Sequence, residues 1–199
     1  MRQESSLSGT RVADRREQIL QVATRLFSQH GYAATSLGDV ADVIGFTKPA
    51  IYYYFESKEE ILFHIHERIV VAGLERVEEI RDGGGDPKAQ LEMILMEHVR
   101  RLLDNVEANL VFAREQAALG ETRAAEIRER DRQYERAVRE VYARGVESGD
   151  FLDLDPRVAV GSLLAACNWA HRWYRPGGTY SVDDIGEMIV SLLSNGYTR

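Results

Sequence analysis

The chain has 199 residues, a formal net charge of −7 and a single cysteine. This length allows a sizeable core in one domain, or in one small and one larger domain. A lone thiol argues against a disulfide framework and is typical of a cytoplasmic protein. No apolar run approaches the ~20 residues of a membrane span, so we expect no membrane partner. Residues 1–10 have no apolar centre, so we interpret them as a disordered tail rather than a signal peptide.

Helix signals recur along the chain and strand signals are almost absent, so the sequence predicts an all-α fold of about nine helices. The first is expected over about residues 12–30, the second and third begin at Ser36 and Thr47, and the fourth spans about 57–82. Ser36 and Ser57 are each followed three residues later by an acidic side chain, as in a capping box.

Five further helices are expected after the Gly83-Gly84-Gly85 break, over about residues 87–105, 108–119, 121–148, 156–175 and from 181 onward. The helix over 121–148 is strongly charged outside one apolar face, so its charges indicate a solvated surface. The last two helices are apolar around much of their circumference, so each needs two partners. We expect one partner to be the same helices of a second copy, which gives a homodimer through residues about 156–195.

The segment from Thr35 to Lys58 predicts a helix–turn–helix. Ala41 lies where two helices approach closely, Gly45 supplies a sharp turn with positive φ, and Ile51 is the core residue of the following helix. A short glycine-containing turn of this kind places its second helix in a DNA major groove. A tight helical hairpin with no DNA role has the same spacing, and the spacing alone leaves that alternative open.

The residues that follow make the interpretation more specific. The run Ile-Tyr-Tyr-Tyr-Phe-Glu-Ser-Lys-Glu-Glu-Ile-Leu at 51–62 resembles the end of the DNA-binding domain in TetR-family transcriptional repressors, and residues 19–36 are similar to that family's first helix and its exit. The resemblance implies a helix–turn–helix domain over 11–56 and a larger effector-binding and dimerisation domain over 57–199. It also implies double-stranded operator DNA as a partner. Position 49 is Pro where many members have Gly, which the first turn of a helix accepts.

Geometry and the resemblance together indicate the DNA contacts. The recognition helix offers Lys48, Pro49, Ala50, Tyr52, Tyr53 and Tyr54. Lys48 and Ala50 are placed to reach base edges, and Tyr53 is the expected second base-side reader. In the family, the positions that match Tyr52 and Tyr54 mostly contact phosphates. Core packing is the alternative for both tyrosines.

Three further residues are expected on the phosphate backbone. Thr35 and Ser36 cap the second helix, whose N–H groups can take a phosphate, and Lys58 is expected to contact another. Residues 1–58 carry a net charge of +1, so the rest of the chain carries −8. We therefore expect the acidic part to be held away from DNA, and specificity to rest on base and shape readout.

The resemblance also implies that the C-terminal domain binds a small effector. Apolar or amphipathic positions that would surround a cavity are Ile65, Met93, Met96, Leu102, Phe112, Gln116, Tyr134 and Tyr142, and plain core packing is the alternative for each. Residues 168–178 resemble the corresponding stretch in acyl-CoA-responsive members. There Trp169 and Trp173 are expected to stack one turn apart, and Arg172 and Arg175 to offset phosphates or a carboxylate. Dimer-interface aromatics with solvent-facing arginines would have the same pattern.

The sequence contains no catalytic constellation, phosphate-binding glycine loop or metal-ligand cluster, so we expect neither an enzyme nor a cofactor. It predicts a cytoplasmic, homodimeric repressor released from a pseudo-palindromic operator by a small apolar acid or an acyl-CoA. One alternative is an all-α ligand-binding or interaction protein with little DNA binding. Another is a multidrug-type regulator of cationic effectors, for which Glu97 and Glu115 are the available acidic residues.

Overall fold

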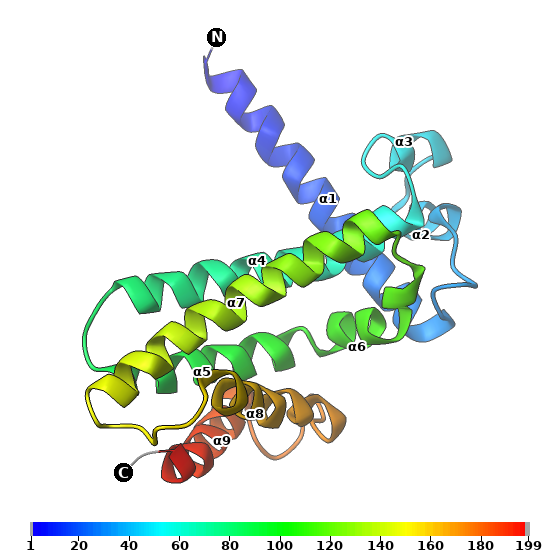
Figure 1. The fold of residues 1–199 in the computed structure, drawn as a ribbon. Coiled ribbons are helices and arrows are strands. Elements are labelled where there is room, and N and C mark those ends of the chain that lie inside the picture. Colours follow the sequence, from blue (N-terminus) through cyan, green and yellow to red (C-terminus); the bar gives the residue numbers. More distant parts are fainter. Residues whose placement is uncertain (1, 198–199) are drawn as a thin grey trace. The chain divides into compact units, whose positions relative to one another are not determined.

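A computed structural model describes the backbone of residues 2–197 and the side chains of residues 12–195. Within that range the chain forms nine α-helices and no β-strand, which confirms the all-α prediction. It divides into two compact units, Met1–Glu67 with Glu107–Ala124 and Arg68–Val106 with Ala125–Arg199 (Figure 1). This division differs from the expected boundary between residues 56 and 57. Among the described helices, none is both long and apolar enough to cross a membrane.

The helices are α1 Arg2–His30, α2 Leu37–Ile44, α3 Lys48–Tyr52, α4 Lys58–Asp82, α5 Pro87–Asp104, α6 Val106–Glu115, α7 Glu121–Glu147, α8 Pro156–Asn168 and α9 Val182–Tyr197. Two 3-10 helices, Gln116–Ala118 and Trp169–Arg172, follow α6 and α8. The helix expected over 156–175 therefore ends earlier as an α-helix and continues as a tighter turn.

The N-terminal segment differs from the expected disordered tail. Helix α1 begins at Arg2, so residues 2–10 are helical, and Met1 lies outside the described residues. The segment contains no proline and a single glycine, Gly9, so nothing in its backbone stops the helix before Val12.

Helices α1 to α3 share a small core in the first unit. Ile19 and Ala23 of α1, Ala41 of α2 and Ile51 of α3 are completely buried, and Phe55 is 1 % exposed. Ala41 thus lies at a close approach between helices, as expected from its small side chain.

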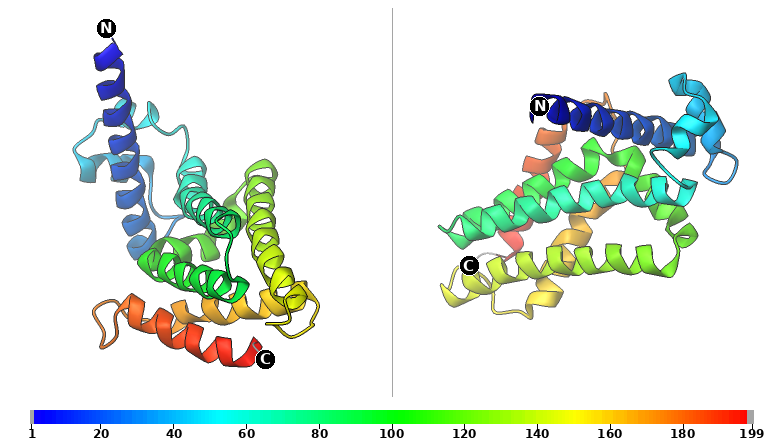
Figure 2. Two further views of the ribbon diagram at one scale, coloured as in Figure 1. Left: turned by 90° about the vertical axis from the view of Figure 1, so that its left-hand side faces the viewer. Right: turned by 90° about the horizontal axis from the view of Figure 1, so that it is seen from above.

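The second unit is organised around α5. Helices α8 and α9 both pack on α5, and Figure 2 shows them running antiparallel beside each other. The apolar face of α7 is buried in the same unit, and its members are Ile127, Tyr134, Val138, Val141 and Tyr142. The charged remainder of α7 therefore forms a solvated surface, as the spacing predicted.

Helices α8 and α9 also carry apolar side chains outside this core. Val158 is 65 % exposed, Met188 48 % and Leu192 75 %. Trp169 and Trp173, just after α8, are 61 % and 50 % exposed. The two-faced apolar character expected of the last two helices is therefore present in the fold, with one face on α5 and one on the surface.

A polar cluster lies within the second unit. His98 of α5 is 8 % exposed, and its Nδ1 lies 2.9 Å from the hydroxyl of Tyr134 and 3.0 Å from a guanidinium nitrogen of Arg101. Its Nε2 lies 2.9 Å from Oδ1 of Asn168. Since Arg101 can only donate, Nδ1 is the acceptor and Nε2–H donates to Asn168, which fixes the tautomer. Burial, together with the Arg101 charge, lowers the pKa of His98 to about 4.

Stability should depend on pH through this histidine. Because the pKa of His98 falls from 6.5 to about 4 on folding, the unfolded chain binds its proton more readily. The contribution of neutral His98 is complete above pH 6.5 and is lost between pH 6.5 and pH 4, by roughly 3 kcal/mol of unfolding free energy. Denaturant titrations across this range should show a shallower pH slope for His98→Leu than for the parent. His171→Asn, at a half-buried position outside the cluster, is the control and should keep the parent slope. Equal slopes for the parent and His98→Leu would contradict the assignment.

Candidate functional site

The local geometry of the helix–turn–helix follows the sequence closely. Ser36 is the N-cap of α2, with its Oγ accepting from Asp39 N–H at 3.2 Å and its own N–H donating to the Asp39 carboxylate at 2.7 Å. These hydrogen bonds from Ser36 lower the pKa of Asp39. Gly45 ends α2 with φ 78°, a left-handed conformation, and Phe46 N–H donates to the Ala41 carbonyl at 2.8 Å. The predicted capping box and glycine turn are both confirmed.

Helix α3 has five residues, too few to be stable by itself, and side chains on either side of it supply its support. The ring of Phe46 before α3 stacks on that of Tyr54 after it, with centroids 6.0 Å apart. From α1, the Arg15 guanidinium lies 5.6 Å from the Phe46 ring centre and that of Arg16 lies 4.1 Å from the Phe55 ring centre. Arg16 also donates a hydrogen bond to the Tyr54 carbonyl. These contacts fix the direction in which α3 projects its other side chains.

The outward side of α3 carries most of the predicted DNA-contacting residues. Tyr53 is 75 % exposed and Tyr52 55 %, whereas Ile51 between them and α2 is completely buried. Lys48 and Pro49 are exposed and Ala50 is half-buried. Tyr54 is half-buried by its packing against Phe46 and Tyr53, so it is part of the support as well as a candidate contact.

Gly38, in the first turn of α2, makes room for Lys48. A Cβ atom at position 38 would lie 2.8 Å from Cε of Lys48, so any larger residue would displace the lysine. The Lys48 charge also contributes to the lowered pKa of Asp39, after the hydrogen bonds from Ser36. This contact places the Lys48 stem beside the start of α2.

Lys58 occupies a different place from the one expected. Its ammonium donates to the carbonyl oxygens of Tyr32, Ala33 and Thr35 at 2.5, 3.3 and 2.9 Å and lies 4.4 Å from the Tyr32 ring centre. An ammonium has three donors, so these acceptors use all of them. Lys58 therefore holds the loop between α1 and α2 in place. We assign it this role instead of the predicted phosphate contact.

Thr35 also differs from its expected role as a cap. The side chain is 4 % exposed, and its hydroxyl donates inward to the Gly31 carbonyl at 2.9 Å. Ser36 alone caps α2. Thr35 therefore stabilises the exit of α1 and does not face outward.

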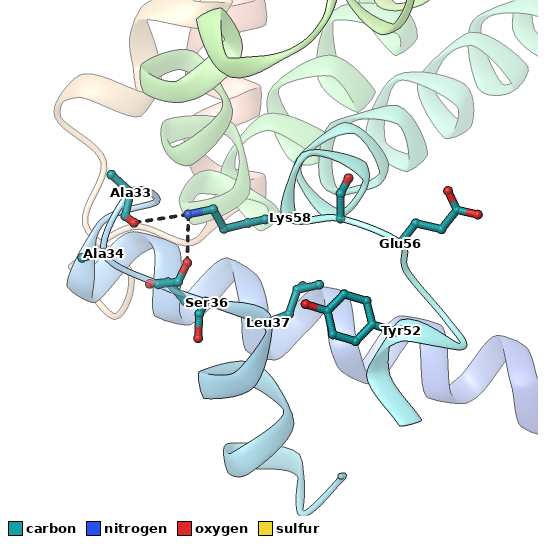
Figure 3. A pocket seen from close by; sticks show the side chains of 9 residues that line it. Ala33, Ala34, Ser36, Leu37, Tyr52, Glu56 and Lys58 are labelled. Atoms are coloured by element: carbon teal, nitrogen blue, oxygen red, sulfur yellow. Dashed lines mark hydrogen bonds between the residues drawn. The ribbon is translucent and has the colours of Figure 1, made fainter. Parts of the chain in front are cut away.

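An open hollow of about 430 Å³ lies beside these residues, between the α1–α2 loop and the start of α4. Figure 3 shows Tyr52 on one side with its hydroxyl turned toward Leu37, and Lys58 on the other side reaching to Ala33. Ser36 and Glu56 also line it. Backbone and hydroxyl groups are thus the polar atoms available in the hollow, together with one carboxylate.

Comparison with known proteins decides the family. Residues 19–65 match the model of the bacterial regulatory proteins of the tetR family, and residues 84–197 match the tetracyclin repressor-like C-terminal domain. The chain belongs to the TetR family. This confirms a TetR-family transcriptional regulator with an N-terminal helix–turn–helix part and a helical C-terminal part.

Relatives extend over nearly the whole chain. A TetR/AcrR-family regulator from Thermobifida fusca is 49 % identical with a TM-score of 0.75, covering 94 % of this chain and 100 % of that one. The transcriptional repressor KstR2 of Mycobacterium tuberculosis is 27 % identical over 94 % of this chain and 95 % of its own, and its structure, described as a ketosteroid regulator, gives a TM-score of 0.82. AibR, solved with isovaleryl coenzyme A and operator DNA, shares the fold at 24 % identity and a TM-score of 0.77, covering 89 % and 97 % of the two chains.

The expected effector residues of this TetR-family regulator fall into both units. Ile65, Phe112 and Gln116 belong to the first. Ile65 is completely buried, and Phe112 stacks on His66 with ring centroids 3.7 Å apart. Gln116 is exposed and donates to the Ala113 carbonyl at 3.4 Å. Packing accounts for Ile65 and Phe112, and Gln116 lies at the surface of its unit.

In the second unit the candidates are spread over separate places. Tyr142 is completely buried, stacks on Phe151 and donates to the Leu152 carbonyl at 2.8 Å, so it is a packing residue. Leu102 is half-buried against the core, and Tyr134 belongs to the polar cluster of His98.

Met93 and Met96 lie at an open hollow between α5 and α9. It has a volume of about 550 Å³, and its other lining residues include Lys88, Glu92 and Glu187. Met93 is 46 % exposed, and the sulfur of Met96 would lie 2.5 Å from a Cβ atom added to Gly186. Met96 therefore fills the space that the glycine leaves on α9, and both polar and apolar side chains line the hollow.

The aromatic and cationic residues after α8 form a surface, with a geometry that differs from the expected stacking. The Arg172 guanidinium lies 5.1 Å from the Trp169 ring centre. Because the segment Trp169–Arg172 is a 3-10 helix, Trp173 is not one α-helical turn from Trp169, and within the described residues no ring contact joins them. Arg175 is exposed and donates to the Tyr174 carbonyl at 3.1 Å.

The acidic residues considered for a cationic effector are engaged or separated. Glu97 accepts from Arg100 at 2.7 Å, and Arg100 also pairs with Asp183 at 2.8 Å. Glu115 belongs to the other unit. Within the second unit, Glu97 is therefore neutralised by its neighbour.

Sequence analysis did not identify several residues that shape these sites. Arg15 and Arg16 hold α3, Gly38 seats Lys48, and Arg101 completes the polar cluster. A usable signal existed only for His98, because a polar residue within the apolar stripe of a helix must find a hydrogen-bond partner inside. Arg15 and Arg16 act on Phe46, Tyr54 and Phe55, which lie far along the chain, so no local pattern marks them.

The new role of Lys58 changes the expected behaviour of a variant. Lys58→Met keeps the aliphatic stem and removes the hydrogen bonds to the loop, so unfolding free energy should fall by about 1–2 kcal/mol. Operator affinity should fall with it, while the slope of log affinity against log salt stays unchanged. The matched control Lys48→Met removes an exposed cation that is expected at base edges, so it should weaken operator binding and relax base preference without the loss of unfolding free energy. A reduced salt slope for Lys58→Met would contradict this role and support the predicted phosphate contact of Lys58.

Proposed function

We propose that this TetR-family regulator represses transcription as a homodimer on a pseudo-palindromic operator. The two α3 helices would enter successive major grooves about 34 Å apart. The observation that carries this proposal is α3 itself, a short helix held from both sides that leaves Lys48, Tyr52 and Tyr53 exposed. Since its operator is chromosomal DNA, the protein would act in the cytoplasm.

Each exposed group has a role in this proposal. Lys48 and Tyr53 would read base edges, and the methyl group of Ala50 is suited to a thymine methyl. Tyr52 would bond a phosphate through its hydroxyl at the hollow of Figure 3. The N-terminus of α2, capped by Ser36, would take a second phosphate.

The experiment for DNA recognition uses Tyr53, the most exposed tyrosine of α3. Tyr53→Ala should weaken binding to an operator selected from random duplexes by about 1–3 kcal/mol and relax specificity at one base position. Tyr180→Ala, at an exposed tyrosine of the second unit, is the control and should bind like the parent. Anisotropy titrations with the operator and with single-base variants supply both readouts. If Tyr53→Ala keeps the parent's affinity and base preference, the assignment of this residue fails.

The homodimer is proposed to form through the outward apolar side chains of α8 and α9. The exposed Val158, Met188 and Leu192 support this interface, because apolar side chains at such exposure on two adjacent helices are stabilised by a partner surface.

Leu192→Asp should separate the dimer. The parent is expected to have twice the 22.5 kDa mass of one chain in light scattering at micromolar concentration, and Leu192→Asp the mass of one chain. The buried charge would lack a partner in the interface. Val43→Asp, at an exposed apolar position of α2, should leave the mass doubled. A monomeric parent would rule out the dimer.

The proposed effector is a small organic acid or its coenzyme A thioester. AibR, whose structure holds isovaleryl coenzyme A, supports this class for the fold. The exposed Trp169, Arg172, Trp173 and Arg175 would suit coenzyme A phosphates and adenine. Helix α4 belongs to both units, so an effector that favours a different α4 tilt would lower operator affinity.

A further inference from the structure

In the second unit, the guanidinium of Arg101 is packed between two other helices. The side chain of Arg101, on α5, lies against Gly73 of α4, where an added Cβ atom would be 1.8 Å from its Nη1. On the other side, its Cζ lies 4.7 Å from the ring centre of Tyr134 on α7. The guanidinium is thus enclosed between the backbone of one helix and the aromatic face of another, and a glycine at position 73 is required for this.

Arg101 has no carboxylate partner. Its guanidinium hydrogen-bonds to Nδ1 of His98 at 3.0 Å and also to the Tyr134 side chain, and it forms no ion pair within the part of the chain that the structure describes. Asp131 of α7 is close enough for the Arg101 charge to lower its pKa, although burial has the larger, opposite effect, and no hydrogen bond or ion pair joins the two among the described residues. A half-buried cation without a bonded anion is unfavourable, and a guanidinium has five donors, so donors remain after the contacts with His98 and Tyr134.

The neighbours of Arg101 leave it as the positive group of the cluster. The pKa of His98 is lowered to about 4 by burial and by Arg101 itself, so its ring stays neutral. Its Nε2–H is directed to Asn168, and the Tyr134 hydroxyl lies at its Nδ1. The cluster therefore orients the guanidinium and supplies no counter-charge, which leaves the remaining donors available to an anion.

We propose that Arg101 binds the free carboxylate of the effector. This deepens the proposed function and rests on it, since it assigns the chemical group that the effector domain recognises. A carboxylate would take two parallel N–H donors and balance the charge that the fold leaves uncompensated. An apolar body would lie against the surrounding core of Leu102, Tyr134 and Cys167. A thioester carbonyl is neutral and cannot balance the cation, so this site favours the free acid over its coenzyme A thioester.

The test compares decanoate, 1-decanol and decanoyl-coenzyme A by calorimetry on the full-length parent, on Arg101→Met and on the double variant Arg172→Ala with Arg175→Ala. Arg101→Met should bind decanoate at least tenfold more weakly than the parent does. The alcohol should bind the parent at least tenfold more weakly than the acid does. Arg101→Lys, which keeps the charge and loses the paired donors, should bind decanoate with an intermediate affinity.

Several results would overturn the proposal. Decanoate binding that is absent, or unaffected in Arg101→Met, excludes the site. Binding of decanoyl-coenzyme A alone, abolished in the double variant, assigns the anion to the surface arginines instead. Thermal unfolding adds a readout without ligand: Arg101→Met should unfold at the parent's temperature or higher, and a large drop would mean that Arg101 is already paired. Operator binding of the ligand-free parent is measured separately, so its failure counts against the proposed repressor and not against the carboxylate site.

Discussion

The contact between the cations of α1 and the aromatic residues around α3 is the constraint on which DNA recognition depends. A helix of five residues has no intrinsic stability, yet base readout requires side chains fixed to within about an ångström. The side chain of Arg16 supplies this constraint, because its guanidinium lies over the Phe55 ring and donates a hydrogen bond to the Tyr54 carbonyl. The recognition helix is therefore part of the α1 core rather than an independent element.

This arrangement has an electrostatic consequence. Arg16 and Lys58 are two of the seven basic residues in the first 58, and both are engaged with groups of their own unit. The charge that remains for the phosphate backbone is small, because the first 58 residues carry six acidic residues beside their seven basic ones. Non-specific affinity should accordingly be weak, and the discrimination between sequences must come from the side chains on α3 and from DNA shape. Low non-specific binding is compatible with an acidic protein that needs to leave its operator.

The sequence predicted what is decided by neighbours in the chain. The Ser36 capping box, the left-handed Gly45 and the apolar face of α7 depend on spacings of three to eight residues, and each was found as expected. Lys58 and Thr35 were misplaced because their partners are carbonyl groups in the exit of α1, whose direction no spacing reveals. Two of the effector candidates show a different limit of the sequence. Tyr142 and Phe112 are large and apolar, and these properties are equally those of core residues, so composition could not separate a cavity from packing.

Gly73 links two positions that are far apart in the sequence. A glycine inside a helix costs about 1 kcal/mol relative to alanine, so α4 is weakened at this point. The guanidinium of Arg101 occupies the volume that any side chain at 73 would fill. Homologues should therefore change the two positions together, with alanine or larger at 73 accompanied by a shorter or uncharged residue at 101. Among regulators of this fold, glycine in the middle of α4 becomes a marker, readable from sequence, for an arginine in the interior of the effector unit.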